Sequence, residues 1–125
     1  MKRKVLIFGA SLGGKRLLNV LDKGDEVIAF LDNDASKHNT TLKGIPIITP
    51  KEGLCHDYDS LIIASQSYSQ IAGQLVQMGL DKEKIEVADP AILRGDYELS
   101  SNRLGCVGLL VAAIIVATIL TFILL

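Results

Sequence analysis

The chain has 125 residues, and its 13 Lys and Arg against 14 Asp and Glu give a formal net charge of −1. This balance excludes the strongly basic surface typical of nucleic-acid-binding proteins, and we expect no nucleic acid among the partners. Cys55 and Cys106 stand in segments of different character and are not expected to form a disulfide, which favours a reducing compartment. All the charged residues lie within residues 1–103, so residues 104–125 form a separate apolar tail.

The first element is a short apolar strand over Val5–Phe8 that ends in a glycine-rich segment, Gly9–Gly14. Apolar residues at helical spacing follow at once and predict a helix over 13–23. Glycines let a backbone approach a ligand closely, and the N–H groups at the start of a helix attract anions. A buried strand that turns sharply into a helix is therefore a typical phosphate-binding site of α/β proteins.

The remaining elements continue the alternation of strands and helices. Further strands are predicted at 26–31, 44–48, 60–64 and 84–88, and a second long helix at 68–78. Such alternation implies right-handed crossovers, which give an α/β fold with a parallel sheet and helices on both faces. We expect the strand order 3-2-1-4-5, with Pro46 in an edge strand. A ligand would then bind at the carboxyl ends of the strands, where the order reverses.

The glycine segment departs at one position from the dinucleotide-binding fingerprint. The pattern is Gly9-x-Ser11-x-x-Gly14, whereas the fingerprint has glycine at the position of Ser11, where the backbone nears the pyrophosphate. The Ser11 hydroxyl could donate a hydrogen bond to a phosphate, or its Cβ could keep a dinucleotide away. The pattern alone leaves both interpretations open.

Polar side chains follow the second and fourth predicted strands. Asp32 lies 18 residues after Gly14, where a carboxylate can accept hydrogen bonds from ribose hydroxyls, which favours NAD or a nucleoside; it could also simply end the strand. Ser65 and Gln66 are further ligand candidates, while Ser67 is expected to cap the next helix. The full set of expected ligand-binding residues is Gly9, Ser11, Leu12, Gly13, Gly14, Asp32, Asn33, Ser65 and Gln66.

Several known catalytic patterns are missing from the sequence. No tyrosine has a lysine four residues later, and the Gly-Lys-Ser/Thr loop of ATPases does not occur. His38 and His56 are isolated, so we expect no metal site. The sequence leaves enzymatic activity open but favours a chain that is not catalytic on its own.

The apolar tail, residues 104–125, has the length and composition of a membrane span. At about 1.5 Å per residue, 22 residues of helix extend over roughly 33 Å, which matches a hydrocarbon core of about 30 Å. Arg94 and Arg103 precede the tail and no charge follows it, so the positive-inside rule places the preceding domain in the cytoplasm. We expect residues 1–90 as a soluble domain, 91–103 as a linker and 104–125 as a tail-anchored, single-pass transmembrane helix in the inner (cytoplasmic) membrane.

Small residues recur on two adjacent faces of this expected helix. One face has Gly105, Gly108 and Ala112, and the other has Ala113, Ala117 and Thr121. Small residues let helices pack closely in lipid, which could support a homo-oligomer or docking on another membrane protein. Glycine and alanine are also common in membrane spans, so both interpretations stay open.

Four segments resemble a recurring small Rossmann-like domain of sugar-nucleotide metabolism. They are Val5–Ala10, Leu31–Asp34, Leu42–Ile48 and Asp57–Ser65, and the likeness extends over residues 3–89. In the family that the chain resembles, this nucleotide-binding domain precedes the catalytic domain of bacterial membrane-bound polysaccharide-biosynthesis dehydratase/epimerases. A similar domain forms the N-terminal, UDP-sugar-binding part of UDP-amino-sugar acetyltransferases.

The resemblance implies that NAD(P) or a nucleotide-sugar, such as a UDP-sugar, binds at Gly9, Ser11, Gly14 and Asp32. Ser11 replaces the usual glycine, and the catalytic half of those enzymes has no counterpart in the sequence. In the dehydratase relatives the membrane helices precede this domain, whereas here the expected span follows it. Enzymatic activity is therefore not carried over.

Two functions of different class follow from these expectations. The first is a membrane-tethered nucleotide-binding module for NAD(P) or a nucleotide-sugar, associated with polysaccharide or sugar-nucleotide biosynthesis and without its own catalytic domain. The second is a nucleotide-sensing regulatory or interaction protein that acts through its transmembrane helix on a membrane partner.

Overall fold

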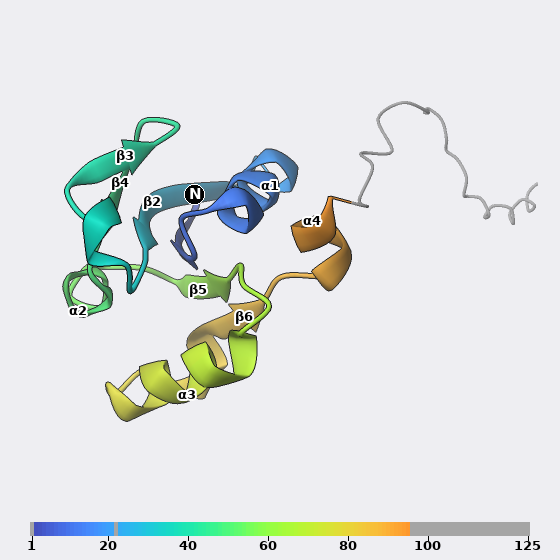
Figure 1. The fold of residues 1–125 in the computed structure, drawn as a ribbon. Coiled ribbons are helices and arrows are strands. Elements are labelled where there is room, and N and C mark those ends of the chain that lie inside the picture. Colours follow the sequence, from blue (N-terminus) through green and yellow to red (C-terminus); the bar gives the residue numbers. More distant parts are fainter. Residues whose placement is uncertain (1, 22, 96–125) are drawn as a thin grey trace, which may run out of the picture.

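The first strand, β1 (Arg3–Phe8), lies inside the sheet between β2 (Asp25–Leu31) and β5 (Ser60–Ile63), and it pairs with both in parallel (Figure 1). Its residues Val5, Leu6 and Ile7 have no exposed surface. Parallel strands that are covered on both faces read as continuous apolar runs instead of alternating patterns. The composition of β1 therefore places it in the interior of the sheet.

The sheet has six strands in the order β3-β4-β2-β1-β5-β6. On either side of the three strands β2, β1 and β5, β4 (Ile45–Ile48) pairs in parallel with β2, and β6 (Ile85–Val87) pairs in parallel with β5. These five strands correspond to the predicted ones and keep their relative positions. The order of the whole sheet differs from 3-2-1-4-5, because a further strand, β3 (Thr40–Leu42), pairs antiparallel with β4. The sheet is therefore mixed, where the sequence predicts a purely parallel one.

The additional strand also makes the edge position predicted for Pro46 wrong. Pro46 lies in β4 opposite Thr41 of β3, so β3 forms the edge of the sheet. Lys43 and Gly44 connect the two strands with φ angles of +55° and +80°, the left-handed values that a two-residue hairpin turn needs. Glycine adopts such values freely and lysine only rarely, so the sequence carries a weak turn signal here.

Helices cover both faces of the sheet, as predicted. The helices α1 (Leu12–Val20) and α4 (Pro90–Arg94) pack against each other on one face. The helix α3 (Tyr68–Gln77) covers the other face, where the short helix α2 (Pro50–Gly53) lies against β2. Each face of the sheet thus contributes to a separate hydrophobic core.

The helix boundaries differ slightly from the predicted ones. Helix α1 ends at Val20 instead of residue 23, because the backbone of Leu21 is extended. Helix α3 ends at Gln77, one residue before the predicted end. Two short 3-10 helices, η1 (Ala35–Lys37) and η2 (Lys82–Lys84), follow β2 and precede β6.

At the amino-terminal ends of the parallel strands, Arg3 is the centre of a polar network. Its guanidinium donates two hydrogen bonds of 3.0 Å to the carboxylate of Asp25 and one of 2.7 Å to Glu86. The same Glu86 oxygen accepts a hydrogen bond from the Ser60 hydroxyl at 2.5 Å. The network therefore joins strands β1, β2, β5 and β6 at the edge opposite to their carboxyl ends.

We expect Arg3→Ala to lower the free energy of unfolding by about 1 kcal/mol, because the Asp25 side chain, only 12% exposed, loses its bidentate partner. Lys4→Ala is the matched control. Lys4 lies 3.8 Å from Asp57, whose side chain is 97% exposed, so we expect a change below about 0.5 kcal/mol. Urea denaturation measures both, and equal effects would argue against a structural role for the Arg3 network.

The structure is a computed structural model that describes residues 2–21 and 23–95, and within them no helix is long and apolar enough to cross a membrane. The transmembrane helix predicted at 104–125, with its small-residue faces, lies outside the described residues, as does most of the predicted linker. The start of that linker belongs to α4, which packs against α1.

Candidate functional site

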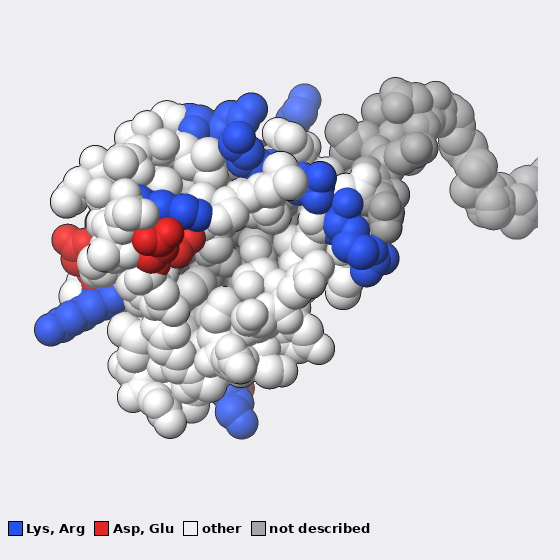
Figure 2. Space-filling view, viewed as in Figure 1, with Lys and Arg blue, Asp and Glu red and all other residues white. Residues whose placement is uncertain are grey.

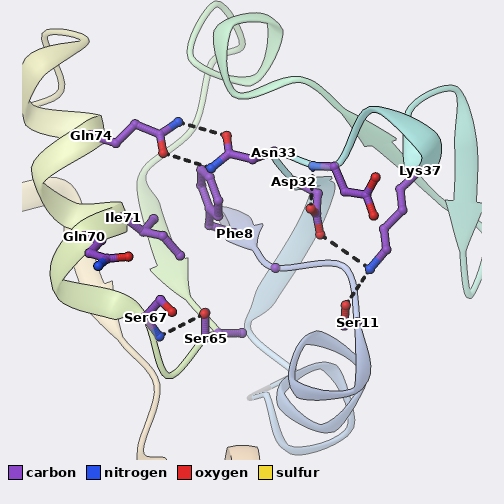
Figure 3. Close-up of a pocket in the computed structure, with 13 residues that line it drawn as sticks. Phe8, Ser11, Asp32, Asn33, Lys37, Ser65, Ser67, Gln70, Ile71 and Gln74 are labelled. Carbon is purple, nitrogen blue, oxygen red and sulfur yellow. Dashed lines mark hydrogen bonds and ion pairs between the residues drawn. The ribbon is translucent and has the colours of Figure 1, made fainter.

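A polar cavity of about 400 Å³ lies at the carboxyl ends of β1, β2 and β5 (Figure 3). The strand order reverses between β1 and β5, so the cavity occupies the place where open α/β sheets bind ligands. Its walls come from the segments that follow these strands, from η1 and from α3. The lining residues are Phe8, Gly9, Ser11, Asp32, Asn33, Asp34, Lys37, Ala64, Ser65, Ser67, Gln70, Ile71 and Gln74.

Part of the ligand-binding set expected from the sequence lines this cavity, namely Gly9, Ser11, Asp32, Asn33 and Ser65. The others lie elsewhere. Leu12, at the start of α1, is 56% exposed. Gln66 lines a neighbouring cavity of about 350 Å³, whose wall also includes residues of α4. Gly13 and Gly14 belong to the start of α1, where they pack closely against backbone.

The glycines after β1 allow three segments of backbone to approach closely. A Cβ atom at Gly14 would lie 2.1 Å from the carbonyl oxygen of Gly9, and one at Gly13 would lie 2.9 Å from that of Ala64. Gly9 has a φ angle of +120°, and a Cβ there would come within 2.7 Å of the same Ala64 oxygen. The loop after β1 is therefore held against the end of β5 with no room for a side chain between them.

Asp32 ties this glycine loop to the end of β2. Its Oδ2 accepts a hydrogen bond of 2.9 Å from the backbone N–H of Ala10, and its Oδ1 accepts one of 2.9 Å from the N–H of Asp34. The Asp32 side chain is only 16% exposed. A carboxylate can accept about four hydrogen bonds, so Asp32 keeps acceptor capacity for a ligand while it fixes the loop.

Lys37 is the cationic group of the cavity, and sequence reasoning missed it. Its Nζ lies 2.5 Å from Ser11 Oγ, 3.4 Å from the carbonyl oxygen of Ala10 and 3.8 Å from Asp32 Oδ2 (Figure 3). Lys37 is the last residue of η1, which carries it over the glycine loop. In the sequence it is one lysine of a polar segment, and only the fold brings it to a serine 26 positions earlier.

Ser11 occupies the N-cap position of α1, but its side chain makes no capping hydrogen bond. A serine cap usually stabilises a helix by about 1 kcal/mol. The Ser11 hydroxyl instead accepts the hydrogen bond from Lys37 at the wall of the cavity. Of the two interpretations that the sequence left open, this position is compatible with a hydroxyl that contacts a ligand.

An amide pair joins the end of β2 to α3 at the rim of the cavity. Asn33 Nδ2 donates to Gln74 Oε1 at 2.9 Å, and Gln74 Nε2 donates to Asn33 Oδ1 at 3.0 Å. Phe8 and Ile71 supply apolar surface near this pair (Figure 3). Sequence reasoning missed Gln74, because it lies 41 residues from Asn33 and reads as an ordinary surface residue of a helix.

Two carboxylates and one ammonium group set the charge of the cavity. The pKa of the Asp34 carboxyl lies below its ordinary value, because Ser36 donates both its hydroxyl and its backbone N–H to it. Asp34 and Asp32 against Lys37 give a formal charge of −1. Figure 2 shows two separate groups of acidic side chains on the left of the view, with basic side chains near them. Lys37 is thus the one positive charge among the side chains that line the described cavity.

Among residues 2–21 and 23–95, no group of three His, Cys, Asp or Glu side chains is placed to hold a metal ion. His38 Nε2 lies 2.7 Å from the carbonyl oxygen of Asp32, and Cys55 is a free, exposed thiol. The cavity is lined by hydroxyl, amide, carboxylate and ammonium groups and by the apolar side chains of Phe8, Ala64 and Ile71. This lining suits a polar ligand of small-molecule size.

The sheet order, the glycine loop and the cavity at the carboxyl edge define a Rossmann-like α/β domain. Residues 1–86 match the model of the family described as C2185-like, N-terminal, and the chain belongs to this family. The solved structure of UDP-D-quinovosamine 4-dehydrogenase from Vibrio fischeri is similar at 30% sequence identity and a TM-score of 0.57, over 78% of this chain and 88% of that chain. No curated protein matches the chain.

These comparisons confirm the coarser part of the resemblance described above, a Rossmann-like fold related to that of a sugar-nucleotide enzyme. The finer part, which concerns dehydratase/epimerases and acetyltransferases, stays a prediction.

Proposed function

We propose that the domain binds a nucleotide or a nucleotide-sugar in the cavity at the carboxyl ends of β1, β2 and β5. The observation that carries the proposal is the cavity itself, in which a compact glycine loop, a carboxylate anchored to that loop and polar side chains meet. In folds of this kind, nucleotides bind at this position of the sheet. The similarity to UDP-D-quinovosamine 4-dehydrogenase, at 30% identity, supports a nucleotide-sugar or NAD(P) as the class of ligand.

The proposal includes a membrane anchor. Residues 104–125 carry no charge and are long enough to cross a bilayer as a helix, and Arg103 directly precedes them. Such a helix would hold the domain at the cytoplasmic side of the inner membrane. The protein would then present a nucleotide or nucleotide-sugar to membrane-bound steps of polysaccharide or sugar-nucleotide biosynthesis.

In this proposal the chain binds its ligand and does not catalyse a reaction alone. The groups that line the cavity are ones that bind a polar ligand, and the proposal assigns the chemistry to a partner protein. Gene neighbours that encode glycosyltransferases or epimerases would support this assignment.

Calorimetric titration of the full-length chain in detergent micelles with NAD, NADP and UDP-N-acetylglucosamine tests the proposal. We expect at least one of these ligands to bind. Gln74→Ala removes a hydrogen-bonding group from the cavity and should weaken that binding roughly three- to tenfold. Gln77→Ala, on the same helix but outside this cavity, is the matched control and should leave it unchanged. The proposal fails if none of the three ligands binds.

A further inference from the structure

The ammonium group of Lys37 lies at the part of the cavity nearest to the glycine loop. It is close to Ser11 Oγ and to the Ala10 carbonyl oxygen, and the Asp32 carboxylate lies 3.8 Å away on the side of β2. The Lys37 side chain is nevertheless 31% exposed, so the cation is positioned but still reachable from the cavity. An ammonium group has three N–H donors, and the two contacts with Ser11 and Ala10 leave one for a ligand.

Ser11 supplies a second donor at the same point. Its oxygen accepts the hydrogen bond from Lys37, and among the described residues no group accepts its hydroxyl hydrogen. A hydroxyl oriented in this way can donate to an oxygen that binds to the ammonium group. Ser11 comes from the loop that precedes α1 and Lys37 from η1, and the two side chains converge on one wall of the cavity.

We propose that Lys37 and Ser11 form the phosphate-binding subsite of this cavity, so that the bound ligand carries a phosphoryl group next to the glycine loop. Asp32 acts in this arrangement as a positioning residue, since it holds both the loop, through the Ala10 N–H, and the lysine. This inference rests on the proposed function, because it names the group that fixes the nucleotide in the cavity. It assigns to Lys37 the role of the cation that binds the phosphoryl group, which the glycine loop alone does not supply.

The contact between Lys37 and Ser11 can also be interpreted as an arrangement for nucleophilic catalysis. Residues Gly9–Gly13 also fit the Gly-x-Ser-x-Gly pattern of a nucleophile elbow, and a lysine beside the serine could serve as its base. A base must accept the serine proton, whereas here Lys37 donates its hydrogen bond to Ser11 Oγ. The arrangement therefore suits the binding of an anion better than the activation of a hydroxyl.

The charges around Lys37 determine how a phosphate group should change the affinity for a nucleotide. Asp32 and Asp34 also line the cavity, so without Lys37 a phosphoryl group would meet two carboxylates and no cation among the lining side chains. The presence of phosphate on a nucleotide should consequently strengthen binding when Lys37 is present and weaken it when Lys37 is replaced by a neutral residue.

The test compares uridine with UDP, and adenosine with ADP, by calorimetric titration of the full-length chain. In the wild type we expect the diphosphate to bind roughly tenfold or more tightly than the nucleoside, as a charge-assisted contact provides. In Lys37→Gln the advantage of the diphosphate should vanish or reverse, and Lys37→Arg should restore part of it. Lys51→Gln removes an exposed lysine outside the cavity and should preserve the wild-type ratio.

Three outcomes overturn the inference. Equal affinities of the wild type for nucleoside and diphosphate would remove the phosphate subsite and leave the proposed nucleotide binding intact. A full diphosphate advantage in Lys37→Gln would exclude Lys37 as the cation. Binding of none of the four compounds would remove the inference, while the titrations with NAD, NADP and UDP-N-acetylglucosamine decide the proposed function. The wild-type ratio should also fall with rising salt, which tests the subsite without any variant.

Discussion

Gly14→Ala should lower the free energy of unfolding by about 3 kcal/mol, the upper end of the usual effect of overpacking. The added methyl group would lie 2.1 Å from the Gly9 carbonyl oxygen and 3.1 Å from Cε1 of the buried Phe30. The nearer atom belongs to the backbone, so no side-chain rotation relieves the contact. The start of α1 would have to move away from β1, which would disturb the core on that face of the sheet.

Gly73→Ala is the matched control for this substitution. Gly73 lies inside α3, and a Cβ atom there would meet nothing within 4 Å. Alanine in a helix interior is more favourable than glycine by about 0.5–1 kcal/mol, so this variant should gain stability. Chemical denaturation of the two variants should give shifts of opposite sign. Similar shifts would mean that the close packing at Gly14 does not limit stability.

Asp32→Asn should lower the free energy of unfolding by about 2 kcal/mol even without ligand. An amide group has one acceptor oxygen, whereas the carboxylate accepts from two N–H groups, those of Ala10 and Asp34. One of these donors would therefore face the amide N–H₂ in a partly buried place. Nucleotide binding should weaken as well, since the glycine loop and Lys37 lose the group that holds them.

The stability of the ligand-free protein separates this role from ribose recognition. A residue that only contacts ribose would leave the unfolding transition unchanged when it is replaced. Asp57→Asn is the control for the loss of one carboxylate, and because its side chain is 97% exposed we expect a change below about 0.5 kcal/mol. Thermal unfolding followed by circular dichroism, without added nucleotide, measures both variants.

The parts of the fold that local pattern determines could be predicted from the sequence. The buried run of β1 and the helical spacing of α3 each carry their own signal, and both lie within a residue or two of the predicted bounds. Strand β3 could not be predicted in this way, because three residues are too few to show a period and its turn begins with a lysine in a left-handed conformation. The premature end of α1 at Val20 depends on how Leu21 leaves the helix.

The same distinction between local pattern and tertiary structure applies to the residues of the candidate site. Ser11 lies in the loop after β1 and Asp32 directly follows β2, and the carboxyl ends of these strands meet, so the place of both residues at the cavity could be anticipated. Lys37 and Gln74 reach the cavity through η1 and α3, and nothing in their sequence neighbourhood separates them from solvated surface residues. The sequence also could not show how closely Gly13 and Gly14 pack against backbone.

The absence of space beside Ala64 has a consequence for the range of compounds that the domain can accommodate. Gly9 and Gly13 both lie against the Ala64 carbonyl oxygen with no room for a Cβ atom. The turn after β1 and the end of β5 can therefore only shift together. The base of the cavity is consequently stiff. Gln74 of the amide pair and Lys37, by contrast, reach the cavity through long side chains with several rotatable bonds. We therefore expect that differently shaped ligands are accommodated by movements of these side chains. Differences in ligand preference within the family should likewise arise at these positions, while the backbone of the glycine loop and of the end of β5 stays the same.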